Sequence, residues 1–309
     1  MPMLIVPCDN SRRKLNVQIF ARVSPQNKYT IIKLLQKHGH DVGYLGDGMN
    51  DAPALKIANV GMVVQTAVES ARDAADIILL KKSLQVIIDG IREGRAVFNN
   101  TLKYVLIILA SNFSNFYSIA IVSLFMDFLP LLPVQILLSN LLTDIAMVML
   151  ATDTVNEADL RIPTKFNIRG LIVRATVLGS VTSLCDVIFL LVFRHQEPAL
   201  FRTNWFIVNV LTEMLVIFSL RSRTFFATAR RPSLSLIVAA VVVSIAGIAI
   251  PMSMWGQELF GFVHPRMADV PTLALLIPSY FIGTEIVKLI YNVIMKKRGL
   301  MPRNKLHVN

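Results

Sequence analysis

Two aspartates, two glycines and an asparagine fall within six residues at positions 46–51, which read Gly-Asp-Gly-Met-Asn-Asp. The carboxylates of Asp47 and Asp51 and the side-chain oxygen of Asn50 suit a hard cation such as Mg²⁺, which also keeps waters and phosphate oxygens as ligands. The glycines allow the tight turn that such a loop needs. Upstream, Lys28 could reach a phosphoryl group as a point charge. The run therefore predicts magnesium-dependent phosphate chemistry.

The elements around this turn alternate between strand and helix patterns. A helix over 26–38 follows Ser24 and Pro25, a usual helix start, and stops at Gly39. The other expected elements are strands at 18–23, 41–45, 60–64 and 76–80 and helices at 51–58 and near 67–74. This alternation predicts a parallel sheet with covering helices, in which ligands bind beyond the carboxyl ends of the strands. Asp47 and Asp51 follow such an end.

Composition separates this region from the rest of the chain. Of 309 residues, 54% are hydrophobic and 17% charged, which is typical of a multi-span membrane protein. We expect a soluble α/β unit over 1–100 and an all-α membrane unit over 101–309. Because about 20 helical residues cross a bilayer, six runs qualify. They are 104–126, 134–151, 172–193, 204–220, 233–254 and 271–295.

The net charge of +11 comes from basic residues near the ends of apolar runs, where they act as topology signals rather than as a nucleic-acid surface. The first, third and fifth gaps between spans carry few basic residues, namely Arg194, Arg202 and Arg266. The remaining gaps and the C-terminal end are rich in them. Both termini are therefore expected in the cytoplasm. Cys8 and Cys185 indicate no disulfide framework, and the N-terminus carries no signal-peptide pattern.

Polar residues inside the spans need a reason, because an Asp at mid-span costs about 2.5–3.5 kcal/mol on insertion scales. Asp144 has Asn140 on the same helical face. In the preceding span, Asn112 and Asn115 share a face, and Pro130 and Pro133 tighten the link between the two spans.

Interhelical hydrogen bonding alone would explain the asparagines. With Asp144 added, an oxygen-lined cation site is the better interpretation. Glu213 is a possible further member. Asp186 and Glu285 are interpreted as structural, Glu285 by pairing with Lys288.

Three strings together resemble the late phosphorylation domain of P-type ATPases, which belongs to the haloacid dehalogenase-like superfamily. They are Phe20 to Pro25 with Lys28, Gly46 to Leu55 (GDGMNDAPAL), and Ala74 to Leu79. The resemblance implies that Asp47 and Asp51 hold the catalytic Mg²⁺ and that Asn50 and Asp51 position the phosphorylated group. It also implies that Arg22 and Lys28 contact the bound cofactor or phosphoryl group.

The membrane half is most similar to the bacterial magnesium-translocating branch of that family. The strings are Ser-Asn-Phe at 111–113, Phe-Leu-Pro-Leu-Leu-Pro at 128–133, Asn-Leu-Leu-Thr-Asp at 140–144 and Trp-Phe at 205–206. The resemblance implies the last six spans of a ten-helix plasma-membrane pump. It places Asn112, Asn115, Asn140, Thr143 and Asp144 at the transported cation, with Glu213 a possible ligand. Thr143 and Glu213 are also similar to calcium pumps, whereas Asn115 replaces a calcium-pump carboxylate, so magnesium is favoured.

Other motifs of that family do not occur in this sequence. No Asp-Lys-Thr is present, so the aspartate that would be phosphorylated is not here, and the nucleotide-binding region, the actuator region and four spans are not represented. ATP would be bound mainly by those regions. The partners expected are therefore the lipid bilayer, a transported divalent cation and the remaining N-terminal portion of a pump. Alone, the chain is expected neither to hydrolyse ATP nor to pump. A stand-alone membrane phosphatase and a non-enzymatic membrane regulator are the alternatives.

Overall fold

The computed structural model describes residues 20, 22–161, 163 and 166–297. The chain forms two compact units, Met1–Ile91 and Arg92–Asn309, which we call the sheet unit and the helix unit. Their boundary lies close to the expected one at residue 100. One long helix, α4 (Leu84–Ser123), begins in the sheet unit and continues as the first helix of the helix unit. It therefore starts well before the span expected at 104–126.

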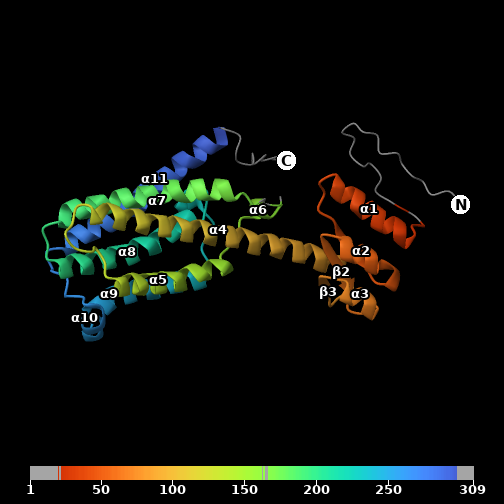
Figure 1. The fold of residues 1–309 in the computed structure, drawn as a ribbon, viewed down its shortest axis with the longest axis horizontal. Helices are drawn as coiled ribbons and strands as arrows, with labels where there is room; N and C mark the ends of the chain where they lie inside the picture. Colours follow the sequence, from red (N-terminus) through yellow and green to blue (C-terminus); the bar gives the residue numbers. More distant parts are fainter. Residues whose placement is uncertain (1–19, 21, 162, 164–165, 298–309) are drawn as a thin grey trace. The chain divides into compact units, whose positions relative to one another are not determined.

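The sheet unit contains a parallel three-stranded sheet of order β1-β2-β3 (Figure 1). The strands are β1 (Gly43–Gly46), β2 (Val60–Val64) and β3 (Ile77–Leu79), with α1 (Pro25–Lys37), η1 (Met49–Asp51), α2 (Ala52–Ile57) and α3 (Glu69–Asp73) as the helices. Its small core is formed by Leu55, Val63, Ala67 and Ala71. The parallel pairing is confirmed, and so is the alternation of strand and helix from β1 to β3.

Residues at the two ends of α1 fix where this helix begins and ends, as the sequence predicts. The Ser24 hydroxyl accepts a hydrogen bond from the backbone N–H of Asn27 at 3.3 Å, and Pro25 is the first helical residue. After the helix, Gly39 has φ +82°, a left-handed conformation that glycine adopts without steric cost.

The strand expected at 18–23 is not present at its described positions. Phe20, Arg22 and Val23 lie outside any strand, and Arg22 has φ 55°, which is incompatible with an extended backbone. The prediction was wrong there, because the apolar run gave no sign of this turn. Residues 18, 19 and 21 lie outside the described residues.

In the described part of the helix unit, six helices are long and apolar enough to cross a membrane, as the sequence predicts. They are α4, α5 (Pro133–Val148, extended by η2, Met149–Thr152), α7 (Ile168–Phe193), α8 (Pro198–Leu220), α9 (Leu234–Met252) and α11 (Val270–Lys297). The connections contain the short helices α6 (Glu157–Arg161), η3 (Phe226–Thr228) and α10 (Met254–Phe260).

Helix α8 is the core of this bundle, packed against α5, α9 and α11 (Figure 1). In its most apolar stretch 72% of residues are buried, compared with at most 39% in the other five long helices. The outer helices instead carry many exposed Leu, Ile and Val side chains, as a lipid-facing surface would. Polar residues of α8 are therefore held in the interior.

Candidate functional site

In the sheet unit, the site is organised around Asp51 at the end of η1. Asp51 Oδ1 accepts hydrogen bonds from Lys28 Nζ and from the Tyr44 hydroxyl, both at 2.6 Å. Its other oxygen, Oδ2, faces the backbone N–H of Gly48 at 3.3 Å and of Asp47 at 3.4 Å. A Cβ added to Gly46 would lie 2.7 Å from Asp51 Cβ. The glycine after β1 is thus needed for the aspartate to fold back onto the turn.

These contacts determine the ionisation of Lys28 and Asp51. Burial of Asp51 opposes its ionisation, but the hydrogen bonds from Lys28, Tyr44 and Gly48 outweigh this and lower its pKa. The same hydrogen bond to Asp51 is the main reason that the pKa of Lys28 is raised. Burial, then the bond to Asp51, raises the pKa of Tyr44. Lys28 and Asp51 are therefore both ionised near neutral pH.

The other expected residues of this site are exposed to solvent. Asp47 and Asn50 are exposed at the carboxyl end of β1, where ligands bind in parallel sheets, and Arg22 is exposed ahead of α1. Asp47 and Asp51, which were both expected to hold Mg²⁺, therefore have different surroundings. The Asp47 carboxylate is open to a cation, whereas Asp51 is engaged by Lys28. Lys28 itself is directed to Asp51, with about a third of its side chain exposed (32%).

In the helix unit, two cavities lie between the long helices. The first is lined by residues of α4, α5, α7, α8 and α11, including Asn115, Asp186 and Glu213. The second is lined by residues of α4, α5 and α8, including Asn115 and Asn140. Asn115 therefore borders both cavities, and so does Asn209 of α8. Amide and carboxylate oxygens from separate helices are brought together here, as a cation site requires.

Thr143 and Glu213 lie at the same place. The Thr143 side chain is buried and its hydroxyl donates to the Asn140 carbonyl at 3.3 Å. Glu213 is only 8% exposed, and the side chains of Thr143 and Asn115 approach its carboxyl group. Of the expected set, the structure brings together Asn115, Asn140, Thr143 and Glu213. Asn112 and Asp144 are instead exposed, and neither lines a cavity described here.

The two acidic residues interpreted as structural have well-defined partners. Glu285 pairs with Lys288 at 2.8 Å, which confirms the expected pair. It also accepts from the backbone N–H of Phe226 at 2.8 Å. Asp186 accepts hydrogen bonds from the hydroxyls of Ser118 and Tyr280, so it connects α7 to α4 and α11.

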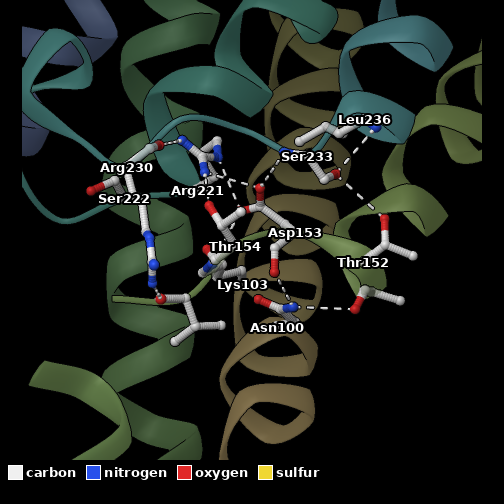
Figure 2. Close-up of polar contacts among 12 residues, drawn as sticks. Asn100, Lys103, Thr152, Asp153, Thr154, Arg221, Ser222, Arg230, Ser233 and Leu236 are labelled. Atoms are coloured by element: carbon white, nitrogen blue, oxygen red, sulfur yellow. Dashed lines mark hydrogen bonds and ion pairs between the residues drawn. The ribbon is translucent and has the colours of Figure 1, made fainter. Parts of the chain in front are cut away.

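The structure contains a polar cluster that the sequence patterns did not predict (Figure 2). Asp153 follows η2, and its carboxylate pairs with Arg221 at the end of α8 and with Lys103 Nζ of α4, the latter at 3.1 Å. The backbone N–H of Ser233, ahead of α9, donates to the same carboxylate at 3.3 Å. Asn100 of α4 donates to the Asp153 carbonyl at 2.7 Å. Four helices thus meet at one end of the bundle.

Some of these site residues could have been recognised from the sequence. Arg221 counted only as a topology signal, although it directly ends an apolar run and is buried in the structure. Asn209 and Glu213 lie four residues apart in α8, a spacing that places both on one helical face. Nothing in the sequence alone pairs Asp153 with Arg221, which are 68 positions apart.

Comparison with known proteins connects this arrangement to a family. The model of the family "Cation transporting ATPase, C-terminus" matches residues 128–290. "Magnesium-transporting ATPase, P-type 1" of Escherichia coli K12 is 38% identical over 281 residues, which are 89% of this chain and 31% of that protein.

"Calcium-transporting ATPase" of Bacillus subtilis 168 is 31% identical over 219 residues, 68% of this chain and 25% of that protein. The chain thus spans about a third or less of the length of these curated relatives. The family model matches more than half of the chain, from the link before α5 into α11, so the chain belongs to the C-terminal family of cation-transporting P-type ATPases.

Proposed function

We propose that the chain is the C-terminal part of an ATP-driven P-type pump that moves Mg²⁺ across the plasma membrane through an aspartyl-phosphate intermediate. The observation that carries this is the position of Asn115, which borders one cavity with Asn140 and another with Glu213. Oxygen donors from α4, α5 and α8 thereby converge in the bundle interior. In a membrane, such donors in the protein interior mark cation pathways.

The choice of magnesium rests on the ligand types and on the relatives. In the described residues, no three His, Cys, Asp or Glu side chains come together as a metal cluster. Mg²⁺ binds through one or two carboxylates and keeps several waters, whereas Ca²⁺ takes six to eight oxygens. The amides of Asn115 and Asn140 suit a partly hydrated ion. The relative at 38% identity is named a magnesium transporter, which supports the same choice.

In this proposal the sheet unit is part of a haloacid dehalogenase-like phosphorylation domain. Asp47 is open at the carboxyl end of β1, so its carboxylate fits a Mg²⁺ ion, with Asp51 as the second carboxylate nearby. The bound ion would neutralise charge on the phosphoryl group. Asp51 holds Lys28 in place, so that its ammonium can approach that group together with Arg22, and the exposed Asn50 directly precedes Asp51 in the chain.

The orientation follows the basic residues. The Thr154 hydroxyl, in the gap before α7, donates a hydrogen bond to the carbonyl oxygen of Arg231, in the gap before α9, at 2.6 Å, so two basic-rich gaps meet at one end of the bundle. By the positive-inside rule, this end faces the cytoplasm, with both termini on the same side. The aspartate that is phosphorylated and the ATP site belong to the N-terminal portion of the pump. The isolated chain is accordingly inactive.

A growth assay tests the proposal. Residues 1–309 replace the matching C-terminal region of the Escherichia coli relative, and the chimera is expressed in a strain that cannot grow at low Mg²⁺. We expect growth to be restored, and to be lost with Asn115→Ala or Asp47→Asn. Rescue of calcium transport without magnesium transport would overturn the choice of ion. ATP hydrolysis by the purified 309-residue chain that disappears with Asp47→Asn would overturn its inactivity.

A calcium pump is the second candidate, because Glu213 supplies a buried carboxylate and Thr143 a hydroxyl beside the cavities. A non-enzymatic membrane regulator is the third. Failure of the chimera to move either ion, with the protein correctly inserted, would favour the regulator.

A further inference from the structure

Helix α10 carries large apolar side chains on its exposed surface. Met254, Trp255 and Leu259 are 67%, 70% and 64% exposed, in a helix of only seven residues. This helix lies in the connection between α9 and α11, at the end of the bundle where α5 begins (Figure 1). Exposed apolar side chains that gather in one place mark an interaction surface. The surface of α10 therefore needs an occupant.

The two ends of α10 determine its depth in the bundle. Helix α9 has 19 residues and is about 28 Å long at 1.5 Å per residue, close to the hydrocarbon thickness of about 30 Å. Only Ser253 separates α9 from α10, so α10 begins where this span leaves the hydrocarbon core. At the other end, the buried Gln135 side chain, in the first turn of α5, donates to the Phe260 carbonyl at 2.8 Å. Both ends of α10 are thus held at the boundary between hydrocarbon and headgroups.

The junction at Ser253 prevents α10 from continuing along the axis of α9. Ser253 has an extended backbone (ψ 153°), and its hydroxyl donates to the Ile250 carbonyl at 2.7 Å and accepts from the Gly256 N–H at 3.0 Å. A Cβ at Gly256 would lie 1.8 Å from the Ile250 carbonyl oxygen, so only glycine permits this close approach. The junction is therefore a defined corner, which sends α10 out of line with the span.

The exposed surface of α10 has an apolar edge and a polar edge. Trp255 and Leu259 lie four residues apart, which places them one turn apart on the same edge. Gln257 and Glu258 lie on another edge, about a third of a turn away at 100° per residue. Met254 lies between these two polar residues. A short helix with this division suits a boundary between apolar and aqueous surroundings.

A lipid-facing stripe of α9 leads directly to the apolar edge of α10. Its members recur at spacings of four, three and four residues, which places them on one face of the helix. All are exposed, and they are Val241, Ile245, Ile248 and Met252. The stripe ends three positions before Trp255. The surface that lipid chains cover on α9 is therefore continuous in the chain with the exposed surface of α10.

We propose that α10 lies in the membrane interface and binds the lipid surface through Trp255 and Leu259. Tryptophan suits this depth, because its ring is apolar while its indole N–H finds polar partners among the headgroups. Glu258 on the polar edge remains in water. With the orientation proposed above, the lipid belongs to the outer leaflet. Bound in this way, α10 fixes the depth of the α9 end and of the link to α11.

Tryptophan fluorescence of the complete chain tests the proposal. The sequence has two tryptophans, and Trp205 is only 4% exposed, packed against Phe189 and Phe201. Trp205→Phe therefore keeps an aromatic ring in the core and leaves Trp255 as the only emitter. The chain is placed in lipid nanodiscs at one copy per disc. Lipids brominated close to the headgroup should quench most of the Trp255 emission, lipids brominated near the chain ends less, and acrylamide in the water little.

Two control variants accompany this measurement. Trp255→Phe leaves the enclosed Trp205, whose emission should change little with either quencher. In the parent chain, the emission that Trp255→Phe removes reports Trp255 with the core unaltered, so the test does not depend on Trp205→Phe folding well. Leu259→Asp should lower lipid quenching of Trp255 and raise acrylamide quenching, because a charge on the apolar edge opposes insertion. Glu258→Gln, on the polar edge, should change neither.

Two results would overturn the proposal. Strong acrylamide quenching of Trp255 without quenching by brominated lipid would place the helix in water. Protection from both quenchers would mean that protein covers Trp255. Neither result depends on ion transport, so the lipid contact of α10 can hold or fail independently of the growth assay.

Discussion

Asp153 and Arg221 form a two-point ion pair, with Arg221 Nε 3.0 Å from Asp153 Oδ2 and Nη2 2.9 Å from Oδ1. The two side chains are 0% and 4% exposed. Paired, parallel hydrogen bonds of this kind fix both distance and orientation. The end of η2 is thereby held against the end of α8.

Asp153→Asn should destabilise the helix unit strongly. Removing one partner of a buried ion pair costs about 3–5 kcal/mol, because the other charge remains buried. Here both Arg221 and Lys103 would be left without their carboxylate. Thermal unfolding of the chain in detergent measures the effect.

The control is Glu157→Gln, at an exposed pair with Arg92 (2.5 Å). Exposed ion pairs contribute little, so its melting temperature should stay close to that of the parent. Equal losses in the two variants would contradict a special role for Asp153.

The Lys28–Asp51 pair predicts a pH-dependent stability in the sheet unit. The pKa of Asp51 is lowered from 3.8, so the stability that its ionised form contributes is present above that value and is lost as pH falls through the lowered pKa. The pKa of Lys28 is raised from 10.5, so its contribution is present below 10.5 and is lost as pH rises through the raised pKa. The pair is therefore strongest between these limits.

Lys28→Met should lower the melting temperature of the sheet unit near neutral pH. The difference from the parent chain should shrink in acid, where Asp51 becomes protonated. Protection of the 43–55 backbone against proteolysis, measured from about pH 2 to pH 8, follows this change. Lys33→Met, elsewhere on α1, is the matched control and should show no such pH dependence. A difference that is constant across the range would exclude the ion pair as its cause.

Sequence patterns predicted the elements of this fold better than its contacts. Alternation of strand and helix signals located β1 to β3, and apolar length located the six long helices, because these depend on neighbouring residues. The start of α4 was missed, since the charged residues of 84–103 do not resemble a span although they continue the same helix.

The same difference between local patterns and contacts applies to the candidate sites. Asn140 became a candidate from its spacing with Asp144 in one helix, and it lines a cavity in the structure, whereas Thr143 was named only through the family resemblance. The pairing of Asp153 with Arg221 and the meeting of Asp186 with Glu213 depend on how separate helices pack, which no local pattern contains. Tyr44 was overlooked because its strand pattern gave no sign that its hydroxyl reaches Asp51.

Gly179 of α7 lies where the backbone of α4 approaches closely. A Cβ at this position would lie 2.8 Å from the Ala110 carbonyl oxygen and 3.2 Å from the Ser114 nitrogen, both backbone atoms. The helices would have to separate, so Gly179→Ala should destabilise the bundle by about 1–3 kcal/mol. Unfolding of the purified chain in a denaturing detergent is the measurement.

Gly94→Ala on α4 is the matched control for this substitution. Nothing lies within 4 Å of a Cβ at Gly94, so alanine should be neutral or stabilise the helix by up to about 1 kcal/mol. Opposite signs for the two variants are expected. A neutral Gly179→Ala would show that α4 and α7 are not tightly packed.

Lys288 is fully buried and serves three acceptors at once. Its Nζ pairs with Glu285 at 2.8 Å and donates to the carbonyls of Ser219 and Thr224, each at 2.9 Å. Lys288→Met would leave a buried carboxylate without its cation, a loss of about 3–5 kcal/mol. Since α11 would lose the bonds from Lys288 to the carbonyls of Ser219 and Thr224, unfolding should be detected first in that region by hydrogen exchange.

The double variant Glu285→Gln with Lys288→Met separates charge from packing. It removes both charges, so the electrostatic part of the loss should be recovered, while the unpaired carbonyls of Ser219 and Thr224 remain. We expect the double variant to be more stable than Lys288→Met alone, which gives a coupling energy between the two positions. Additive losses would mean that the pair contributes through packing only.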